Sequence, residues 1–277
     1  MNLIKNILKK GIRLIGILLI IILLIGLIHL AEGLIRGTRI TYEEITFSTE
    51  KFPEDKEKYT IAFLTDIHDY PHEKLEQMVI NINERQPDIL LLGGDFSQRK
   101  GVMPKELEIL SRVKTNDGIY GVAGNHDQWK FLFAAMEENE MNTLMNEGVE
   151  INEWLYLAGT ADYWNAVNLA DIQESISGAE ENQFVLLLTH NADLTMKQST
   201  DGVDLVLSGH THGGEVSLFG LWKPALPTVT RFGNKFGGGM AASRDEVPVY
   251  VSRGVSGWMP IRIFAPPEVT YITITRK

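Results

Sequence analysis

The chain has 277 residues, of which 44% are hydrophobic and 22% are charged, so it is long enough for a large domain and too apolar for wholesale disorder. It contains no cysteine, which excludes disulfides and thiolate metal ligands. The formal net charge is −10, so we expect no nucleic-acid partner, and any anionic substrate needs local positive charge that metal ions could supply.

The N-terminus contains a long apolar segment, residues 14–31, interrupted only by His29. Its 18 residues cover about 27 Å as a helix, close to the hydrocarbon thickness of a bilayer. More basic residues precede it, in 1–13, than follow it closely (Arg36 and Arg39), so we expect a cytoplasmic tail, a transmembrane anchor and an extracytoplasmic body. A signal peptide is the alternative, but this core exceeds the usual length and no small-residue cleavage site follows.

Residues 32–58 are polar, and we expect a stalk there. From residue 59 on, strand patterns alternate with helical ones. The expected strands are "YTIAFLTDIH", "PDILLLGGD" and "GIYGVAGNHD", separated by the helical patterns "HEKLEQMVININERQ" and "PKELEILSRV", and the strand theme returns in "NQFVLLLTH" and "GVDLVLSGHTH". This rhythm predicts an α/β layered domain whose chemistry lies at the carboxyl ends of its strands.

The composition changes beyond about residue 213, where glycine, proline and β-branched residues become common. The runs "VPVYVSR" and "EVTYITITR" predict strands of a second sheet. We find no internal repeat and no boundary that divides this part of the chain, so residues 59–277 are predicted to form one domain.

Five apolar runs end in Asp, Asn or His. The residues at these ends are Asp66, His68, Asp95, Asn125, His126, Asp127, His190, His210 and His212. A single histidine after a strand is ordinarily a solvated or core hydrogen-bonding group, but five of the seven histidines at such ends indicate a shared site. Imidazole and carboxylate groups together suit divalent transition metals, and the flanking glycines allow sharp turns.

The ordered motifs "DIH", "GGD", "GNHD", "TH" and "GHTH" resemble those of the calcineurin-like metallophosphoesterase superfamily. The resemblance covers residues 60–275 and is specific, because five motifs agree in order and spacing. The ending "VYVSRGVSGWMPIRIFAPPEVTYITI" is similar to the tail of the bacterial exported or membrane-anchored branch. The resemblance implies an α/β fold of two packed β-sheets flanked by helices, and hydrolysis of a phosphomonoester, phosphodiester or pyrophosphate.

The resemblance also implies a binuclear centre of two divalent transition metal ions, with Mn, Zn or Fe as candidates. The implied ligands are Asp66, His68 and His212 for the first ion, Asn125, His190 and His210 for the second, and Asp95 for both. The ions would activate water for attack on phosphorus. His126 would bind no metal and would stabilise developing charge or protonate the leaving oxygen.

Two positions depart from the family pattern. Several relatives have an aspartate that orients the catalytic histidine at the position of Gln98, and a glutamine side chain cannot stabilise an imidazolium by charge. Asp127 is the nearest alternative carboxylate in the sequence. Glu215 replaces a glutamine that is frequent in this branch, and the sequence assigns it no role.

The segment "FGLWKPALPTVTRFGNKFGGG" mixes aromatic and basic residues just after the last metal motif. Trp222, Lys223 and Arg231, with Trp258 in a second apolar tip, are candidate contacts for a lipid-linked or cell-envelope phosphoester. Ordinary hairpin loops are the alternative interpretation.

Two other functions compete with hydrolysis of a phosphoester. A catalytically silent member of the superfamily would serve as a membrane-tethered interaction module, but such proteins typically lose metal ligands and none is missing here. A mononuclear zinc peptidase would require H-E-x-x-H, which the sequence lacks.

Overall fold

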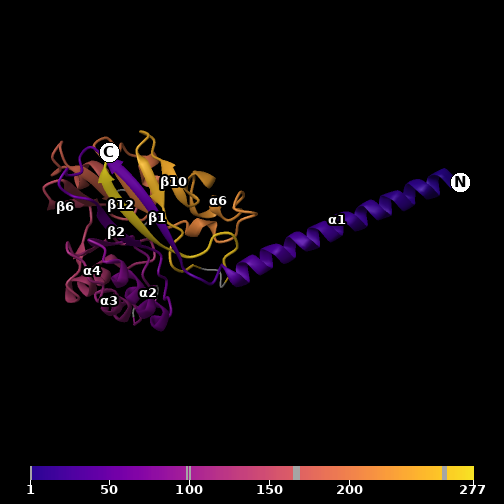
Figure 1. Cartoon of the computed structure of the whole chain (residues 1–277), viewed down its shortest axis with the longest axis horizontal. Coiled ribbons are helices and arrows are strands. Elements are labelled where there is room, and N and C mark those ends of the chain that lie inside the picture. Colours follow the sequence, from indigo (N-terminus) through magenta and orange to yellow (C-terminus); the bar gives the residue numbers. More distant parts are fainter. Residues whose placement is uncertain (1, 98, 100, 165–168, 258–260) are drawn as a thin grey trace.

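A long N-terminal helix projects from an α/β body in a computed structural model of the chain, which describes residues 2–97, 99, 101–164, 169–257 and 261–277 (Figure 1). This helix, α1 (Asn2–Ile35), extends beyond the expected span at both ends. Within the described residues it is the one helix long and apolar enough to cross a membrane, a character that signal sequences share. Its apolar side chains are exposed, and only its C-terminal end contacts the body.

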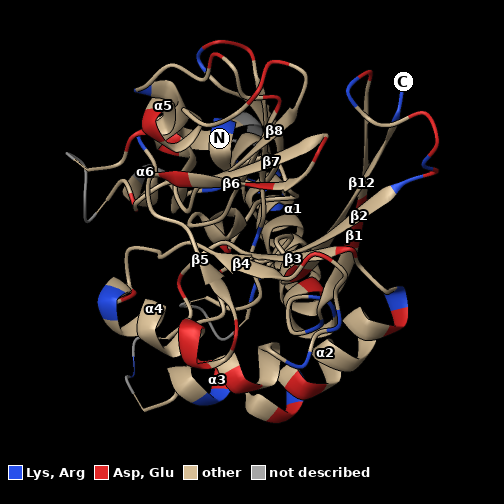
Figure 2. Ribbon diagram, turned by 90° about the vertical axis from the view of Figure 1, so that its left-hand side faces the viewer, with Lys and Arg blue, Asp and Glu red and all other residues tan. Residues whose placement is uncertain are grey.

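The first sheet has six strands in the order β1-β12-β2-β3-β4-β5. Their bounds are Thr41–Thr49 (β1), Glu268–Arg276 (β12), Tyr59–Leu64 (β2), Ile89–Leu92 (β3), Ile119–Gly121 (β4) and Asn142–Thr143 (β5). Strands β2 to β5 run parallel, as the βαβ rhythm predicts. Their crossover helices are α2 (His72–Arg85), α3 (Met103–Leu110) and α4 (Trp129–Glu138), which cover one face of the sheet (Figure 2).

The second sheet also has six strands, in the order β10-β11-β9-β8-β7-β6. Their bounds are Gly239–Ala242 (β10), Pro248–Val251 (β11), Leu205–Ser208 (β9), Phe184–Leu188 (β8), Leu155–Gly159 (β7) and Glu147–Asn152 (β6). The four central strands are parallel, and the two edge strands are antiparallel to their neighbours. Short helices flank this sheet, among them α5 (Ile172–Ser175) and α6 (Leu226–Val229).

The two sheets pack face to face, and their shared apolar layer includes Phe63 and Leu91 of the first sheet and Leu157, Leu188 and Leu207 of the second. A second apolar cluster fills the space between the first sheet and α2 to α4. Strands covered on both faces read as continuous apolar runs, which is why they stand out in the sequence. The expected architecture of two packed sheets flanked by helices is confirmed.

Two expectations about individual strands are wrong. Residues 41–49, within the expected stalk, form β1, which pairs in parallel with β12 from Thr41 opposite Glu268 to Thr49 opposite Arg276. Its alternate residues are exposed, so this edge strand resembles a polar linker in sequence. Residues 268–276 lie in the first sheet, antiparallel to β2, whereas β11 does lie in the second.

Candidate metal centre

The polar residues that follow β2, β3, β4, β8 and β9 converge where the carboxyl ends of the two sheets meet. Within each of two groups, every side chain offers one ligand atom within 4.8 Å of the others. The first group is Asp66, His68 and His212, and the second is Asp95, His190 and His210. Each group draws on loops from both sheets, so packing of the sheets brings the groups together.

Asp95 lies between the groups. Its Oδ2 atom is 3.5 Å from Nε2 of His68 and 3.3 Å from Nε2 of His190. Asn125 belongs beside the second group, because its Oδ1 atom is 3.1 Å from the same nitrogen of His190. One carboxylate oxygen therefore faces a histidine of each group.

Three histidine rings are oriented by backbone carbonyls. Nδ1 of His190 donates to the carbonyl of Gly93 over 2.7 Å, and Nδ1 of His212 donates to that of Ser256 over 2.9 Å. Nε2 of His210 donates to the carbonyl of Val229 over 2.9 Å. Each ring thus keeps its other nitrogen for the centre, as in histidines that bind metals. A set of oriented imidazoles and buried carboxylates fits divalent transition metals.

The two carboxylates are also held by neighbouring donors. Asp66 accepts hydrogen bonds from the hydroxyl of Thr65 (2.9 Å) and from the backbone N–H of His210 (3.0 Å). Oδ1 of Asp95 accepts from the backbone N–H of His126 (2.8 Å), which leaves Oδ2 facing the histidines. These bonds fix the carboxylates before any ligand arrives.

Asp127 ties two of the site loops together. Its carboxylate accepts hydrogen bonds from the backbone N–H groups of Asp95 (2.7 Å), Phe96 (3.0 Å) and Gly124 (2.8 Å). Both oxygens are therefore engaged by the backbone after β3 and β4, so Asp127 positions Asp95. Gln98, the other residue considered as a partner of His126, lies outside the described residues.

The charge states of the buried groups follow from their neighbours. Burial alone would raise the pKa of Asp95, but His190 and His68 hold it well below its usual value. Burial alone would lower the pKa of His190, but the Asp95 carboxylate raises it well above its usual value. Burial lowers the pKa of His212 to about 4 and lowers those of His68 and His210. Ionised carboxylates and neutral imidazoles are the forms that bind metals, so three of the four histidines already favour the binding form. His190 would release the proton that Asp95 stabilises when a cation binds.

Five of the seven predicted ligands have a left-handed backbone conformation. Their φ values are 55° (Asp66), 43° (His68), 57° (Asp95), 72° (His210) and 51° (His212). This conformation costs a residue other than glycine about 1–2 kcal/mol. Strain of this kind clusters at functional sites, where the surrounding structure enforces it.

Two glycines are required by close approach of the ligands. A Cβ atom on Gly124 would lie 2.2 Å from Oδ1 of Asp95, and one on Gly209 would lie 2.5 Å from Oδ2 of Asp66. Neither carboxylate could keep its place beside a larger residue. The glycines of "GNHD" and "GHTH" are therefore part of the site.

His126 belongs to neither group of converging side chains. It is half-buried, and its ring centre lies 5.4 Å from that of His68. Its backbone N–H is bound to Asp95, so its position is coupled to that of the shared carboxylate. The ring therefore lies at the edge of the centre.

Arg262 is a buried residue of the site that we did not predict. It is 2% exposed, and its Nη2 atom lies 3.3 Å from Nδ1 of His212. Burial lowers its pKa to about 10, and the charge of Glu215 opposes that shift. Glu215 thus has a physical role, as a negative charge facing a buried guanidinium. An arginine within the apolar run "WMPIRIF" was the available signal.

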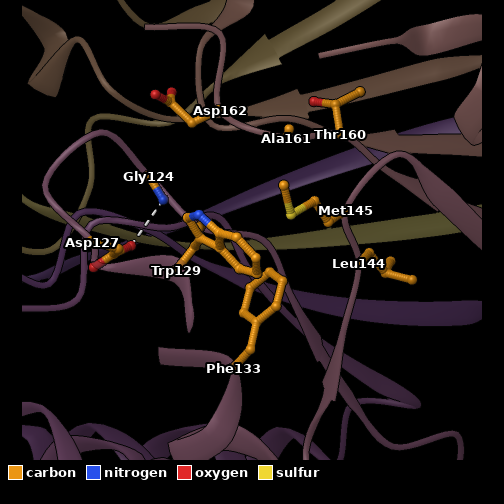
Figure 3. Close-up of a pocket in the computed structure, with 10 residues that line it drawn as sticks. Gly124, Asp127, Trp129, Phe133, Leu144, Met145, Thr160, Ala161 and Asp162 are labelled. Carbon is orange, nitrogen blue, oxygen red and sulfur yellow. Dashed lines mark hydrogen bonds between the residues drawn. The ribbon is translucent and has the colours of Figure 1, made fainter. Parts of the chain in front are cut away.

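A largely apolar pocket adjoins the centre (Figure 3). Trp129 and Phe133 of α4 line one side, and Met145 lies opposite them. Asp127 and Asp162 supply the carboxylates of its wall, and the charge of Asp162 acts on His190 of the second group. The pocket is small, about 30 Å³, so it offers a limited apolar contact area next to the predicted ligands.

The predicted substrate-loop residues have different environments. Trp222 is 59% exposed, and Arg231 is exposed, whereas the ammonium group of Lys223 donates to the backbone carbonyl of Gly237. Trp258 lies outside the described residues. Phe236, from the same aromatic segment, is buried in the core, so only part of this segment is available to a ligand.

Comparison with known proteins agrees with this geometry. A family model described as calcineurin-like phosphoesterase matches residues 59–214. An uncharacterized metallophosphoesterase of Aquifex aeolicus is 30% identical, over 85% of this chain and 92% of its own length. An uncharacterized metallophosphoesterase of Helicobacter pylori is 28% identical over 80% of this chain. The match spans only 61% of the length of that relative. A transmembrane protein with metallophosphoesterase domain from Danio rerio is 28% identical, over 83% of this chain and 56% of its own length.

Proposed function

Because the chain belongs to the calcineurin-like phosphoesterase family, we propose that it is a membrane-anchored, binuclear metal-dependent hydrolase of a phosphoester. The observation that carries this proposal is the position of Asp95, 3.5 Å from His68 and 3.3 Å from His190, between two groups of Asp and His side chains. Paired metals in phosphatases lie about 3.5–4 Å apart, which such a shared carboxylate suits. The bond is that of a phosphomonoester, a phosphodiester or a pyrophosphate.

The ligand assignment follows the two groups. We assign Asp66, His68 and His212 to one cation, Asn125, His190 and His210 to the other, and Asp95 to both. The donors suit Mn, Zn or Fe. When bound, two such cations supply positive charge to the phosphoryl oxygens and lower the pKa of the attacking water.

The chain's own contribution to the reaction is to orient groups and to move a proton. His126 lies beside the first group and donates a proton to the leaving oxygen. Its backbone bond to Asp95 holds it there, and Asp127 holds Asp95 through three backbone N–H groups. With glutamine at position 98, no carboxylate at that position stabilises the imidazolium, so we expect a modest contribution from this proton transfer.

The location we propose is a cell membrane, with the body on the extracytoplasmic side. Residues 14–31 of α1 span the bilayer, the basic residues 1–13 stay in the cytoplasm, and the body begins at β1. The exposed apolar surface of α1 supports an anchor, as do relatives described as transmembrane proteins. We place the chain in the bacterial exported or membrane-anchored branch for the same reason.

A lipid-linked or cell-envelope phosphoester is the substrate class that we favour. The pocket beside the second group is lined by Trp129, Phe133 and Met145. The ring centres of Trp164 and His210 are 5.8 Å apart. Trp129 and Trp164 are 43% and 49% exposed, so they offer apolar contacts at the mouth of the site. Such contacts suit a substrate whose phosphate carries an apolar group.

The test is metal content and hydrolysis by the purified full-length chain in detergent. We expect two metals per chain and hydrolysis of a chromogenic phosphodiester. Asp95→Asn removes charge shared by two cations, so it should lower the metal content and abolish activity together. The exposed Asp201→Asn serves as the matched control and should retain both.

Two results would contradict the proposal in different ways. Full metal content without hydrolysis of any monoester, diester or pyrophosphate would favour the silent, membrane-tethered interaction module. A wild-type chain that binds no metal would reject the ligand assignment itself.

A further inference from the structure

A tight turn, residues 218–222, protrudes from the body shortly after the last metal motif. The carbonyl of Leu218 accepts from the N–H of Leu221 over 2.9 Å, and Leu218 also donates to the carbonyl of Trp222 over 2.7 Å. Phe219 and Gly220, at its centre, have φ values of 52° and 77°. Left-handed conformations at both central positions are typical of type I′ turns and are unusual for a bulky residue such as phenylalanine.

The turn exposes an apolar surface without any charged or polar side chain. Leu218 is 40% exposed, Phe219 46%, Leu221 81% and Trp222 59%. Four large apolar side chains that are adjacent in sequence and exposed to this degree mark a contact surface. By comparison, Ile80 and Met240 are exposed singly, on other elements.

The turn contacts α1 near the end of its apolar span. The backbone N–H of Phe219 donates to Nε2 of His29 over 3.3 Å, and the two ring centres lie 4.4 Å apart. One helical turn further along, Glu32 accepts from the backbone N–H of Phe264 over 2.6 Å. A Cβ atom on Gly33 would lie 2.7 Å from the side chain of Ile261, so helix and body are in direct contact here. These contacts fix the height of the turn along α1.

We infer that the turn 218–222 inserts into the same bilayer that α1 spans and so forms a second membrane contact of the body. The inference rests on the proposed membrane anchor. His29 is two residues before Ala31, which ends the apolar span, or about 3 Å along the helix. The turn beside it therefore lies at the boundary between hydrocarbon and head groups, where tryptophan and other amphipathic rings are enriched.

The surface of the turn adjoins α1, so we expect lipid rather than another protein to cover it. The helix leaves the body at the turn, so the lipids around its last apolar residues reach Phe219 and Leu221 as well. Arg36 and Arg39, which follow the span, are exposed at the level of lipid phosphates. The turn thus offers apolar side chains to the hydrocarbon, and the two arginines offer positive charge to the lipid phosphates.

Membrane contact at the turn also sets the position of the metal centre. Ser217 donates to the carbonyl of Ile263, and Ile263 donates to that of Glu215, each over 2.8 Å. Glu215 is three residues from His212 of the first group. The inserted turn therefore holds the metal loop close to the bilayer surface, within reach of phosphoesters carried by membrane lipids.

Site-directed spin labelling tests the inference, because the chain has no cysteine and a single introduced one is labelled uniquely. The full-length chain carrying a nitroxide at Leu221→Cys is reconstituted in phosphatidylcholine–phosphatidylglycerol vesicles. We then compare how often the nitroxide collides with oxygen, which is enriched in the bilayer, and with a water-soluble nickel chelate. Leu19→Cys in α1 is the reference for the bilayer interior, and Ile80→Cys on α2, 52% exposed, is the reference for water.

We expect the ratio of oxygen to nickel collisions at position 221 to exceed that at position 80 at least fivefold and to stay below that at position 19, as a label at the boundary of the hydrocarbon should. A ratio at 221 equal to that at 80, with position 19 deep in the bilayer, would overturn the inserted turn while leaving the anchor intact. Water-like values at position 19 as well would reject the anchor and, with it, the inserted turn. Dipolar broadening at 221 without bilayer contact would show that a second copy of the chain covers the turn, which would also overturn the inference.

Discussion

Asp95 is the residue on which the two halves of the candidate centre depend. Its Oδ2 atom faces His68 and His190, while Oδ1 is held by the backbone of His126. The space for this carboxylate exists because residue 124 has no side chain. A single methyl group at that position is therefore a sensitive probe of the centre.

We predict that Gly124→Ala displaces Asp95 and weakens metal binding by about 10–100-fold, the usual effect of losing the support of a ligand. Metal content after dialysis against a graded chelator series measures this effect. The matched control is Gly101→Ala, because a Cβ atom there would meet no atom of the described residues within 4 Å, apart from its chain neighbours. Equal metal retention by the two variants would show that Asp95 tolerates the displacement.

His126→Ala tests the proposed proton donor. The variant should keep two metals, since His126 lies in neither ligand group, and its activity should fall by about 10²–10⁴-fold, toward the lower end because Gln98 offers no charge. The loss should shrink for nitrophenyl esters, whose leaving group departs without protonation. Elemental analysis and kinetics are measured beside His72→Ala, another half-buried histidine. Loss of a metal, or the same deficit with good and poor leaving groups, would remove His126 from this role.

The sequence identifies candidate ligands at the residue scale because chemistry limits them to Asp, Asn and His at strand ends. It does not identify Arg262, because nothing in the sequence places "IRIF" beside His212. The left-handed conformations of Asp66 and His210 were equally out of reach, since they arise from packing between loops of different sheets. The residue types thus identify the possible ligand side chains, whereas tertiary contacts determine their orientation.

At the scale of elements, α3 carries a buried glutamate whose ionisation opposes folding. Glu106 is fully buried, and neither of its oxygens has a hydrogen-bond partner among the described residues. Burial, together with the charges of Asp69 and Asp127, raises its pKa from 4.5 to about 8. The folded chain thus holds this proton more tightly than the unfolded chain does.

We predict that this glutamate makes the metal-free protein less stable as pH rises from about 4.5 to about 8. The contribution of Glu106 to the free energy of unfolding is fully present below about pH 4.5 and is lost as the pH approaches about 8. Between these values the unfolded chain releases the proton of Glu106 and the folded chain keeps it. This loss of stability amounts to a few kcal/mol, at about 1.4 kcal/mol per pKa unit. Glu106→Gln cannot ionise and should remove it, so the variant should be more stable than wild type at pH 8.5. Denaturant unfolding at pH 5 and pH 8.5 measures it, with the exposed Glu137→Gln as control. Parallel pH profiles for wild type and Glu106→Gln would contradict the prediction.

Element prediction succeeded where burial on both faces makes a strand continuously apolar, as in β2, β3, β8 and β9. It failed for β1, whose exposed face makes "TYEEITFST" resemble a linker. It also failed for the sheet to which β12 belongs, because strand composition does not encode the partner, and the partners Thr41 and Glu268 are far apart in sequence. Such long-range pairing follows from the assembled core.

At the scale of the whole molecule, the two layers of sheet and the long apolar N-terminal helix could be predicted from the sequence, but the way the helix meets the body could not. The contact between His29 and Phe219 joins residues 190 positions apart, and neither belongs to a recognisable motif. If α1 spans a membrane as proposed, this contact decides which face of the body meets it, because α1 leaves the body beside the turn 218–222. The metal loop is on that side, so in the proposed arrangement the cations would lie between the acidic body and a phosphate carried by a lipid.

This orientation predicts that the turn matters for substrates in membranes and little for soluble ones. Leu221→Asp places a charge at the most exposed apolar position of the turn, so it should withdraw the turn from the bilayer without touching the ligand groups. With the full-length chain in vesicles, we expect hydrolysis of vesicle-embedded phospholipid to fall at least tenfold, while hydrolysis of a soluble chromogenic phosphodiester stays within about twofold of wild type. Met240→Asp, at a position on β10 that is 54% exposed, controls for the added charge. An equal loss on both substrates would mean that the change disturbs the centre itself, and no loss on either would mean that the turn plays no part in presenting membrane substrates.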